Sequence, residues 1–229
     1  FHANSAGVKY QYNDKKITAS FGTNIGVSNF IQNDSSGKKV VLFRYVNLFP
    51  TSRLMYKFSS QKNLNLSYNG SPSPPGIDQV QPILENTNPL YVTIGNPDLK
   101  QSYNHNISLF YTDYKVLTGR NIWITGSFNP IQNSIVTNQN TVAGVTTQQY
   151  VNTKGNYSYY FSGSYGFKMK GDIYSGFDLR TNGGRYVNFV NSARNTNTQN
   201  AISLGSNIGK YKQDKFDVNA SLSFGYNFS

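Results

Sequence analysis

Polar and apolar residues alternate along most of the chain, in segments of about ten residues or more that each end in a turn. The clearest segment covers residues 216–228, where every second position is apolar or aromatic and the positions between hold Asp, Asn, Ser or Gly. Because neighbouring side chains of a β-strand point to opposite faces, this period of two predicts a strand with one apolar and one polar face. The pattern predicts about ten such strands in antiparallel, up-and-down order.

The predicted strands are joined by short turns at one end and by longer connections at the other, an asymmetry that is typical of outer-membrane barrels. A break is expected at Pro50 within the strand over residues 40–58, because proline cannot donate a ladder hydrogen bond. The short turns are predicted near residues 13–16, 59–62, 114–120, 168–171 and 210–214. The longer polar loops are predicted at residues 33–37, 138–145 and 191–198.

One further connection, at about residues 70–101, is predicted to be a single long structured loop at the extracellular end. The surrounding segment 67–111 holds six of the eight prolines, so its middle is not expected to be sheet interior. It is also too rich in Ile, Leu, Val and Tyr to be a solvated tether. Alternating residues on both sides, Leu64 to Tyr68 and Ile107 to Tyr111, predict two strands that enter and leave the loop.

The segment 47–111 resembles the barrel region of TonB-dependent outer-membrane receptors of the Bacteroidetes type. Those receptors carry Ser-Tyr at a strand end, a proline-bearing loop, Asn-Pro-Leu, and Gly-Asn-Pro-x-Leu-Lys before the next strand. One departure is Gln101-Ser102, where the family usually has Pro-Glu, which affects where the descending strand starts. The matching residues are Asn47-Leu48-Phe49-Pro50-Thr51, Ser67-Tyr68, Pro74-Pro75, Asn88-Pro89-Leu90 and Gly95-Asn96-Pro97-Asp98-Leu99-Lys100.

The resemblance implies an all-β transmembrane barrel in the cell outer membrane, of which this chain is a portion. The family's whole barrel has about twenty-two strands, with an N-terminal plug domain that is absent from residues 1–229 and a segment that contacts the TonB system. The function implied is uptake of a small polar solute, namely a glycan, a peptide or a metal chelate. Outer-membrane lipid and, through the missing parts, the TonB system are the partners expected.

The chain opens in mid-pattern with Phe1 and shows no initiator Met or signal peptide, which favours a processed or excised piece. Ten strands are too few for the large barrel, so the piece alone would have two open edges. These edges would pair with missing strands, close on each other, or produce edge-to-edge self-association with a second copy.

Composition supports strands with one apolar and one uncharged polar face, since only 14% of the 229 residues are charged. No apolar run approaches the 18 or more residues of a membrane helix, so any membrane crossing must be a closed barrel. The 21 basic residues against 10 acidic ones collect in the short turns, where they suit phospholipid headgroups or simple solubility. No basic cluster is interleaved with stackable aromatics, so no nucleic-acid partner is expected.

Two alternative functions remain open at this point. A soluble or surface β-sheet module for binding or adhesion would also show alternating strands. An outer-membrane barrel enzyme would need a His oriented by a carboxylate, and neither His2 nor His105 can be matched with Asp172, Asp178 or Asp217. We therefore expect no enzymatic activity, no cofactor and no metal site.

The sequence nominates two sets of functional residues. The loop can present polar groups to a solute, or it can be a folded unit of its own. In the second case Asp78 caps a helical turn that ends at Pro82, Asn96 and Pro97 form a tight turn, and a small core packs together. That core would comprise Ile77, Val80, Ile83, Leu84 and Ile94. The ligand-binding candidates are Asn86, Asn88, Tyr91, Asn96 and Asp98. The predicted lipid-facing residues are Leu64, Phe161, Leu204, Phe216, Leu222 and Phe224.

Overall fold

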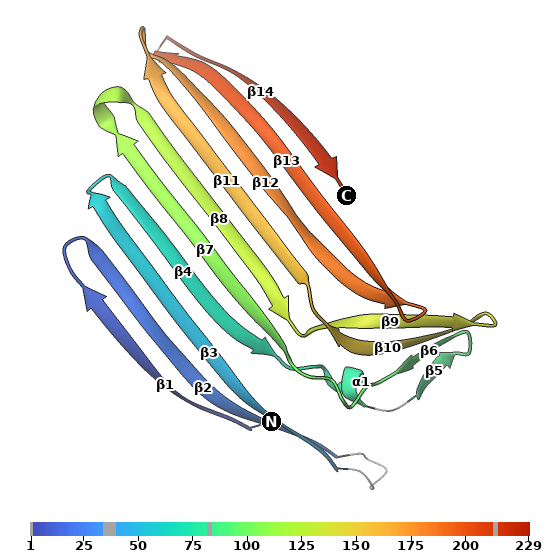
Figure 1. The fold of residues 1–229 in the computed structure, drawn as a ribbon. Helices are drawn as coiled ribbons and strands as arrows, with labels where there is room; N and C mark the ends of the chain where they lie inside the picture. The colour runs from blue at the N-terminus through green and yellow to red at the C-terminus, as the bar shows by residue number, and fades with distance from the viewer. Residues whose placement is uncertain (1, 34–39, 82–83, 213–214) are drawn as a thin grey trace.

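The computed structural model describes residues 2–33, 40–81, 84–212 and 215–229, whose strands form one 14-stranded sheet (Figure 1). Ten of these strands are long, lie side by side in chain order and pair antiparallel with their neighbours. The predicted all-β, up-and-down architecture is therefore confirmed. The ten strands are β1 (His2–Asn13), β2 (Ile17–Asn33), β3 (Val40–Ser59), β4 (Lys62–Ser73), β7 (Ser102–Lys115), β8 (Arg120–Gln132), β11 (Asn156–Met169), β12 (Ile173–Val190), β13 (Ala193–Lys212) and β14 (Phe216–Phe228).

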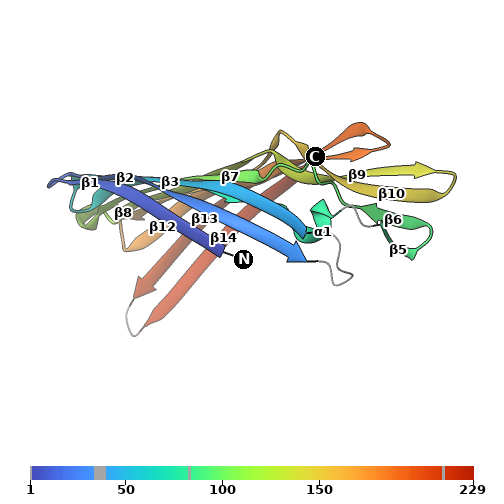
Figure 2. The same cartoon turned by 90° about the horizontal axis from the view of Figure 1, so that it is seen from below.

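The sheet is open. Within the described residues β1 pairs only with β2 and β14 only with β13, and the two edge strands lie on opposite sides of the molecule (Figure 1). The strand direction rotates from β1 to β14, as expected for a twisted sheet (Figure 2). The ten strands hold 12 to 20 residues each, more than the roughly 9–11 that a tilted strand needs to cross a bilayer. An open sheet of such strands is consistent with part of a larger barrel.

The pairing register places the apolar positions of all ten strands on one face of the sheet. Directly paired residues point to the same side, so a row of partners traces one face across the sheet. This row is Ile17, Tyr56, Leu64, Tyr111, Ile124, Gly163, Leu179, Leu204 and Phe224. The tenth strand, β1, shares this face because Tyr12 is paired with Ala19, two residues from Ile17. We call this side the apolar face and the other side the polar face.

The apolar face is bare. Leu222 and Phe224 are 75% and 70% exposed, and the buried hydrophobic residues in the described part of the chain are only Val80, Leu99, Val136 and Val187. A soluble sandwich needs a second sheet against such a face to make a dry core. Here the described strands form a single layer, and the exposed apolar surface suits a lipid environment.

Two predicted interruptions of the long strands are wrong. β3 runs through Pro50 without a break. Its pairing with β4 begins only at Thr51, so at Pro50 the strand is paired with β2 alone. A proline is tolerated at such a position because only one of the two neighbouring ladders is present. The predicted loop at 191–198 is a turn of only Asn191 and Ser192, with φ values of 49° and 61°. Two left-handed residues match the twist of a hairpin, so the polar residues that follow continue as β13.

The short turns near residues 13–16, 59–62, 114–120 and 168–171 are confirmed, and they lie together at one end of the sheet (Figure 1). The third of them holds a short 3₁₀ helix (Val116–Thr118), which ends at Gly119 with a φ of 60°. In the fourth, Lys168 lies 2.6 Å from Asp172 and its hydrogen bond lowers the pKa of that carboxyl. Residues 34–37 of the predicted loop at 33–37 and residues 213–214 of the last turn lie outside the described residues.

Candidate functional site

At the opposite end of the sheet from the short turns, shorter elements form a projecting unit that we call the annex (Figure 1). In the annex β6 pairs in parallel with β10, and β10 pairs antiparallel with β9. The middle of β9 pairs in parallel with the end of β12. The predicted long loop is thus a helical turn followed by a hairpin, and the predicted loop at 138–145 is the tip of a second hairpin. The annex comprises α1 (Ile77–Val80), β5 (Leu84–Asn88), β6 (Tyr91–Ile94), β9 (Ser134–Val142) and β10 (Val145–Thr153).

Local backbone chemistry explains how the annex forms. The side chain of Asn88 accepts a hydrogen bond from the Leu90 amide over 3.0 Å and thereby closes the turn between β5 and β6. Ala143 and Gly144, with φ values of 50° and 82°, make the two-residue turn between β9 and β10. Gly95 lies against the backbone of Gln81, where an added β-carbon would be 1.8 Å from the Gln81 carbonyl oxygen. Only glycine fits at that crossing.

The helical turn is capped differently from the prediction. Its N-cap is Gly76, and the Gln79 side chain accepts the Gly76 amide hydrogen over 2.9 Å, so Asp78 does not cap it. Val80 is 2% exposed and anchors the turn, whereas Ile77 is 49% exposed and lies outside the expected small core. Ile94 is half-buried. Pro82, Ile83 and the side chain of Leu84 lie outside the described residues.

The annex strands have one face of hydroxyl, phenol and amide groups. Register pairs Tyr91 with Thr146 and Gln148 with Gln139, so these side chains share a face. The other face carries most of the valines of β9 and β10, including Val136, which is 2% exposed. We call the first set the annex polar face: Tyr91, Thr93, Thr137, Gln139, Thr141, Thr146, Gln148 and Tyr150.

The annex polar face continues the polar face of the main sheet. Where β9 joins β12, Gln139 is paired with Val190 and Asn138 with Phe189. Val190 lies an even number of residues from Asp178, Arg180 and Asn182, so Gln139 and the long polar face of β12 are on the same side. The outward side of the annex likewise continues the apolar face through Phe189.

The side chains of the annex polar face are joined by hydrogen bonds. The Tyr91 hydroxyl donates to Gln148 Oε1 over 2.5 Å, and Gln139 Nε2 donates to both groups, over 3.3 Å to Tyr91 and 3.0 Å to Gln148. The hydroxyls of Thr141 and Thr146 are 2.9 Å apart. The phenol of Tyr91 remains accessible, because the residue is 39% exposed. The cluster offers donors and acceptors without a formal charge.

The five ligand-binding candidates occupy different surroundings. Asn88 and Asn96 serve the backbone: Asn96 Nδ2 donates to the Tyr150 carbonyl over 2.8 Å, and its Oδ1 accepts from the Asp98 amide over 3.0 Å. Asp98 is exposed at that turn. Asn86 lies in β5, and its side chain is outside the described residues. Of the five, the structure brings Tyr91 into the annex polar face.

Sequence reasoning missed Gln139 and Gln148, the two partners of Tyr91. Each lies in a run of five polar residues between two valines, at 137–141 and 146–150, so no alternation marks these segments as strands. The predicted loop at 138–145 covers Gln139, and Gln148 lies just after it.

The six predicted lipid-facing residues all have the parity of the apolar face. Leu64, Leu204 and Phe224 belong to the traced row itself, and the other three lie an even number of residues away from it on β11 and β14. Their contact with lipid stays a prediction. His105, for which the sequence offered no carboxylate partner, is also on this face, where its Nδ1 lies 3.0 Å from the Tyr68 hydroxyl. The described residues contain no group of three or more His, Cys, Asp or Glu that could hold a metal ion, and no helix among them is long and apolar enough to cross a membrane.

Comparisons with known proteins add the family. Among solved structures, the fold is similar to the "Copper transporter OprC", with a TM-score of 0.51 and 9% identity over 97% of this chain and 39% of that one. The outer-membrane transporter YddB from Escherichia coli is also similar, with a TM-score of 0.48 and 9% identity over 98% of this chain and 34% of that one. The chain thus spans less than two-fifths of either protein. No curated protein matches the sequence.

The sequence model of the outer membrane protein beta-barrel family matches residues 2–229, almost the entire chain. This match agrees with the single twisted sheet and its bare apolar face, and it assigns the chain to the outer membrane rather than to a soluble sandwich. The chain belongs to the outer membrane protein beta-barrel family.

Proposed function

We propose that this chain is part of the wall of a TonB-dependent type of transporter, and that the annex binds a polar, uncharged solute at the extracellular mouth. One observation carries the proposal. The polar face of the sheet continues without interruption into the annex polar face through the pair Val190 and Gln139. In a barrel whose apolar face meets lipid, the polar face lines the lumen and the annex polar face lines its rim.

The open sheet supports a barrel larger than the ten strands described. β1 and β14 have unpaired edges, which a membrane cannot tolerate, so further strands must join them. The fold likeness to OprC extends over 97% of this chain, which fits a segment of a large transporter barrel. Coupling to the TonB system would take place through parts of the receptor outside residues 1–229.

The chemistry of the annex polar face favours a solute rich in hydroxyl or amide groups. Its eight residues include no charged side chain, so an ion would find no counter-charge among them. Gln148 Nε2 has no hydrogen-bond partner within the described residues, and Tyr91 can exchange its bond to Gln148 for one to a solute. A glycan, a peptide or a metal chelate presents the required acceptors and donors, in that order of preference.

The test uses the full receptor in its own membrane and a panel of labelled neutral oligosaccharides, short peptides and iron(III) or copper(II) chelates. We expect receptor-dependent uptake of one class. Tyr91→Ala and Gln148→Ala should each weaken binding of that probe about tenfold, since each removes hydrogen bonds worth about 1 kcal/mol or more.

Gln149→Ala is the matched control, because Gln149 neighbours Gln148 on the strand but points to the opposite face. It should leave binding unchanged, and all three variants should assemble in equal amounts. Uptake of no probe class, or equal losses for Gln148→Ala and Gln149→Ala, would contradict a binding mouth at the annex polar face.

A further inference from the structure

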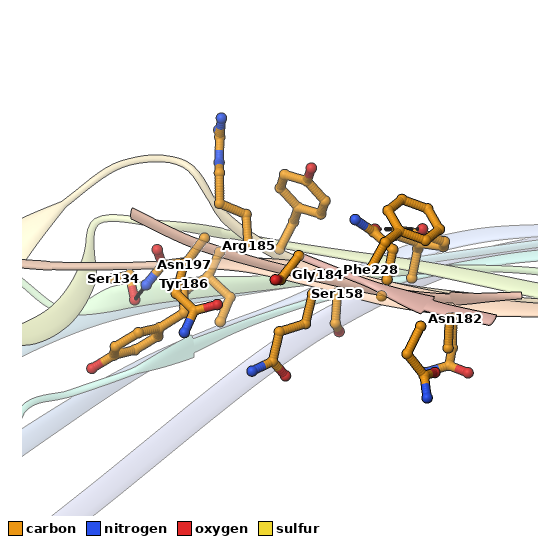
Figure 3. A pocket seen from close by; sticks show the side chains of 18 residues that line it. Ser134, Ser158, Asn182, Gly184, Arg185, Tyr186, Asn197 and Phe228 are labelled. Atoms are coloured by element: carbon orange, nitrogen blue, oxygen red, sulfur yellow. Dashed lines mark hydrogen bonds between the residues drawn. The ribbon is translucent and has the colours of Figure 1, made fainter. Parts of the chain in front are cut away.

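Two arginines stand on the apolar face near the annex end of the sheet. Arg185 on β12 is paired with Tyr157 and lies six residues from Leu179, so it has the parity of the apolar face. Arg194 on β13 is paired with Phe189 and lies ten residues from Leu204, on the same face. In Figure 3 Arg185 and Phe228 project from one side of the sheet, whereas Tyr186 and Asn182 project from the other. Charged residues on an outward face need an explanation.

The two guanidinium groups converge beside Gly155. Arg185 Nε donates to the Gly155 carbonyl over 2.7 Å, and Arg194 Nη2 donates to the adjacent Lys154 carbonyl over 3.0 Å. A β-carbon on Gly155 would lie 2.7 Å from Arg185 Nη2 and 3.2 Å from Arg194 Nη2. Gly155 has a φ of 99°, so this position both needs glycine and leaves the two cations facing a common space.

The positive charge at this place is not balanced by the protein. Within the described residues neither arginine forms an ion pair; the ion pairs found there join Arg120, Lys168 and Arg180 to Asp113, Asp172 and Asp178. Lys154 adds a third, exposed cation. Like charges held this close repel each other, and an anion bound between them would relieve the repulsion.

The surroundings fit the headgroup region of a membrane. The Arg185 guanidinium lies 5.2 Å from the centre of the Tyr157 ring. Tyr159, Asn200 and Phe228 lie on the same face, and with Arg185 they line one part of a hollow of about 1030 Å³ whose other lining residues belong mostly to the polar face. Aromatic residues at this level are typical of the interfacial girdle of a membrane barrel.

The position of Arg185 along β12 also places it at the level of the headgroups. On β12 the apolar-face positions change from Phe177 and Leu179 to Thr181, Gly183 and Arg185 toward the annex. Arg185 lies six residues beyond Leu179, which is about 20 Å along the strand and about 15 Å of height at a barrel tilt of roughly 40°. Half of an apolar band about 25 Å tall is less than this height. Arg185 therefore lies just beyond the band, on the side of the annex.

We propose that Arg185 and Arg194 bind a phosphate group of a phosphorylated glycolipid in the outer leaflet. The planar guanidinium pairs with phosphate oxygens through two hydrogen bonds, which an ammonium group cannot do. The acyl chains of the same lipid would lie along the bare apolar face below, against Phe161 and Leu204. The site goes beyond the proposed transport function and rests on two parts of that proposal, namely that the apolar face meets lipid and that the annex lies at the extracellular end.

The test measures lipid binding to the purified full receptor in a neutral detergent by native mass spectrometry. The probes are lipid A with two phosphates, the same lipid A after phosphatase treatment, and inorganic phosphate. R185Q/R194Q should bind lipid A at least about tenfold more weakly than the native receptor, because charge-assisted contacts to phosphate are lost. The native receptor should bind the dephosphorylated lipid as weakly as the variant does.

K210Q/K212Q is the control, because both lysines lie on the same strand and the same face as Arg194 but at the short-turn end. It should bind lipid A as the native receptor does. Equal binding by R185Q/R194Q, or equal binding of the dephosphorylated lipid, overturns the proposal. Inorganic phosphate binding as tightly as lipid A also overturns it, since the site would then be a simple anion site. If the double variant fails to assemble, R194Q alone, at an exposed residue, is judged by the same criteria.

Discussion

At the level of single residues, the face to which a side chain points decides its role more than its chemical type does. Leu222 and Ser223 are neighbours on β14, yet only Leu222 has the parity of the apolar face. The period of two was enough to predict this for Leu64, Phe161, Leu204, Phe216, Leu222 and Phe224, because parity is a local property of a strand. The partners of Tyr91 were not predictable in this way, since they depend on which strands meet.

Leu222→Arg should therefore impair assembly, whereas Ser223→Arg should be tolerated. A basic side chain near the bilayer midplane costs about 2–4 kcal/mol, but one that points into a wet lumen does not. The check is the unfolding free energy of the full receptor in lipid vesicles, together with the assembled fraction in cells. Equal damage by the two substitutions would mean that the faces are assigned wrongly.

At the level of elements, the turns explain both what was predictable and what was not. Short turns with Asn-Asp-Lys or Lys-Gly sequences stand out between alternating segments, and their positions followed from the sequence. The Ala143–Gly144 and Asn191–Ser192 turns did not, because Ala and Ser are unusual at positive φ and the flanking residues are polar. The second half of β9 and the first third of β13 consequently fall in predicted loops.

Ser192→Gly should stabilise the β12–β13 hairpin by about 1 kcal/mol, because a left-handed conformation costs a non-glycine residue about that much. Amide hydrogen exchange near the turn, at residues 188–195, should slow by a factor of about five. Gly144→Ala in the sister turn should have the opposite effect on β9 and β10. Faster exchange in Ser192→Gly would show that the turn is not of the type described.

Gly95→Ala should detach the annex while leaving the barrel intact. The added β-carbon would overlap the Gln81 carbonyl, and relieving such a clash costs about 1–3 kcal/mol. Limited proteolysis should then cut within residues 74–101. The loss of solute binding should be about as large as in Tyr91→Ala. Gly225→Ala is the control, because its β-carbon would meet nothing nearer than 3.9 Å.

For the whole molecule, the sequence predicted the sheet better than the site. Strand number, order and orientation follow from local alternation and short turns. The annex depends on the parallel pairing of β6 with β10, two segments more than fifty residues apart, and no local pattern specifies that contact. The fold is therefore readable from the sequence, but the residues that the annex gathers at the mouth are not.

The open edges give a prediction for residues 1–229 produced alone. β1 and β14 each present a row of unpaired backbone groups, so the isolated chain should associate through its edges or remain in detergent. Light scattering of the refolded chain should give either a protein–detergent complex or, where the edges pair with each other, a protein mass of at least two copies. A compact monomer that stays soluble without detergent would contradict the open membrane sheet.

The most direct test of the central claim, that one face of this sheet meets lipid and the other lines a wet lumen, uses spin labels on β13 of the full receptor in vesicles. Single labels are placed at Ile202, Ser203, Leu204 and Gly205, and their collision rates with oxygen and with a water-soluble nickel complex are measured. The account predicts oxygen-accessible labels at 202 and 204 and nickel-accessible labels at 203 and 205. Four labels with the same accessibility, or the reverse alternation, would contradict it.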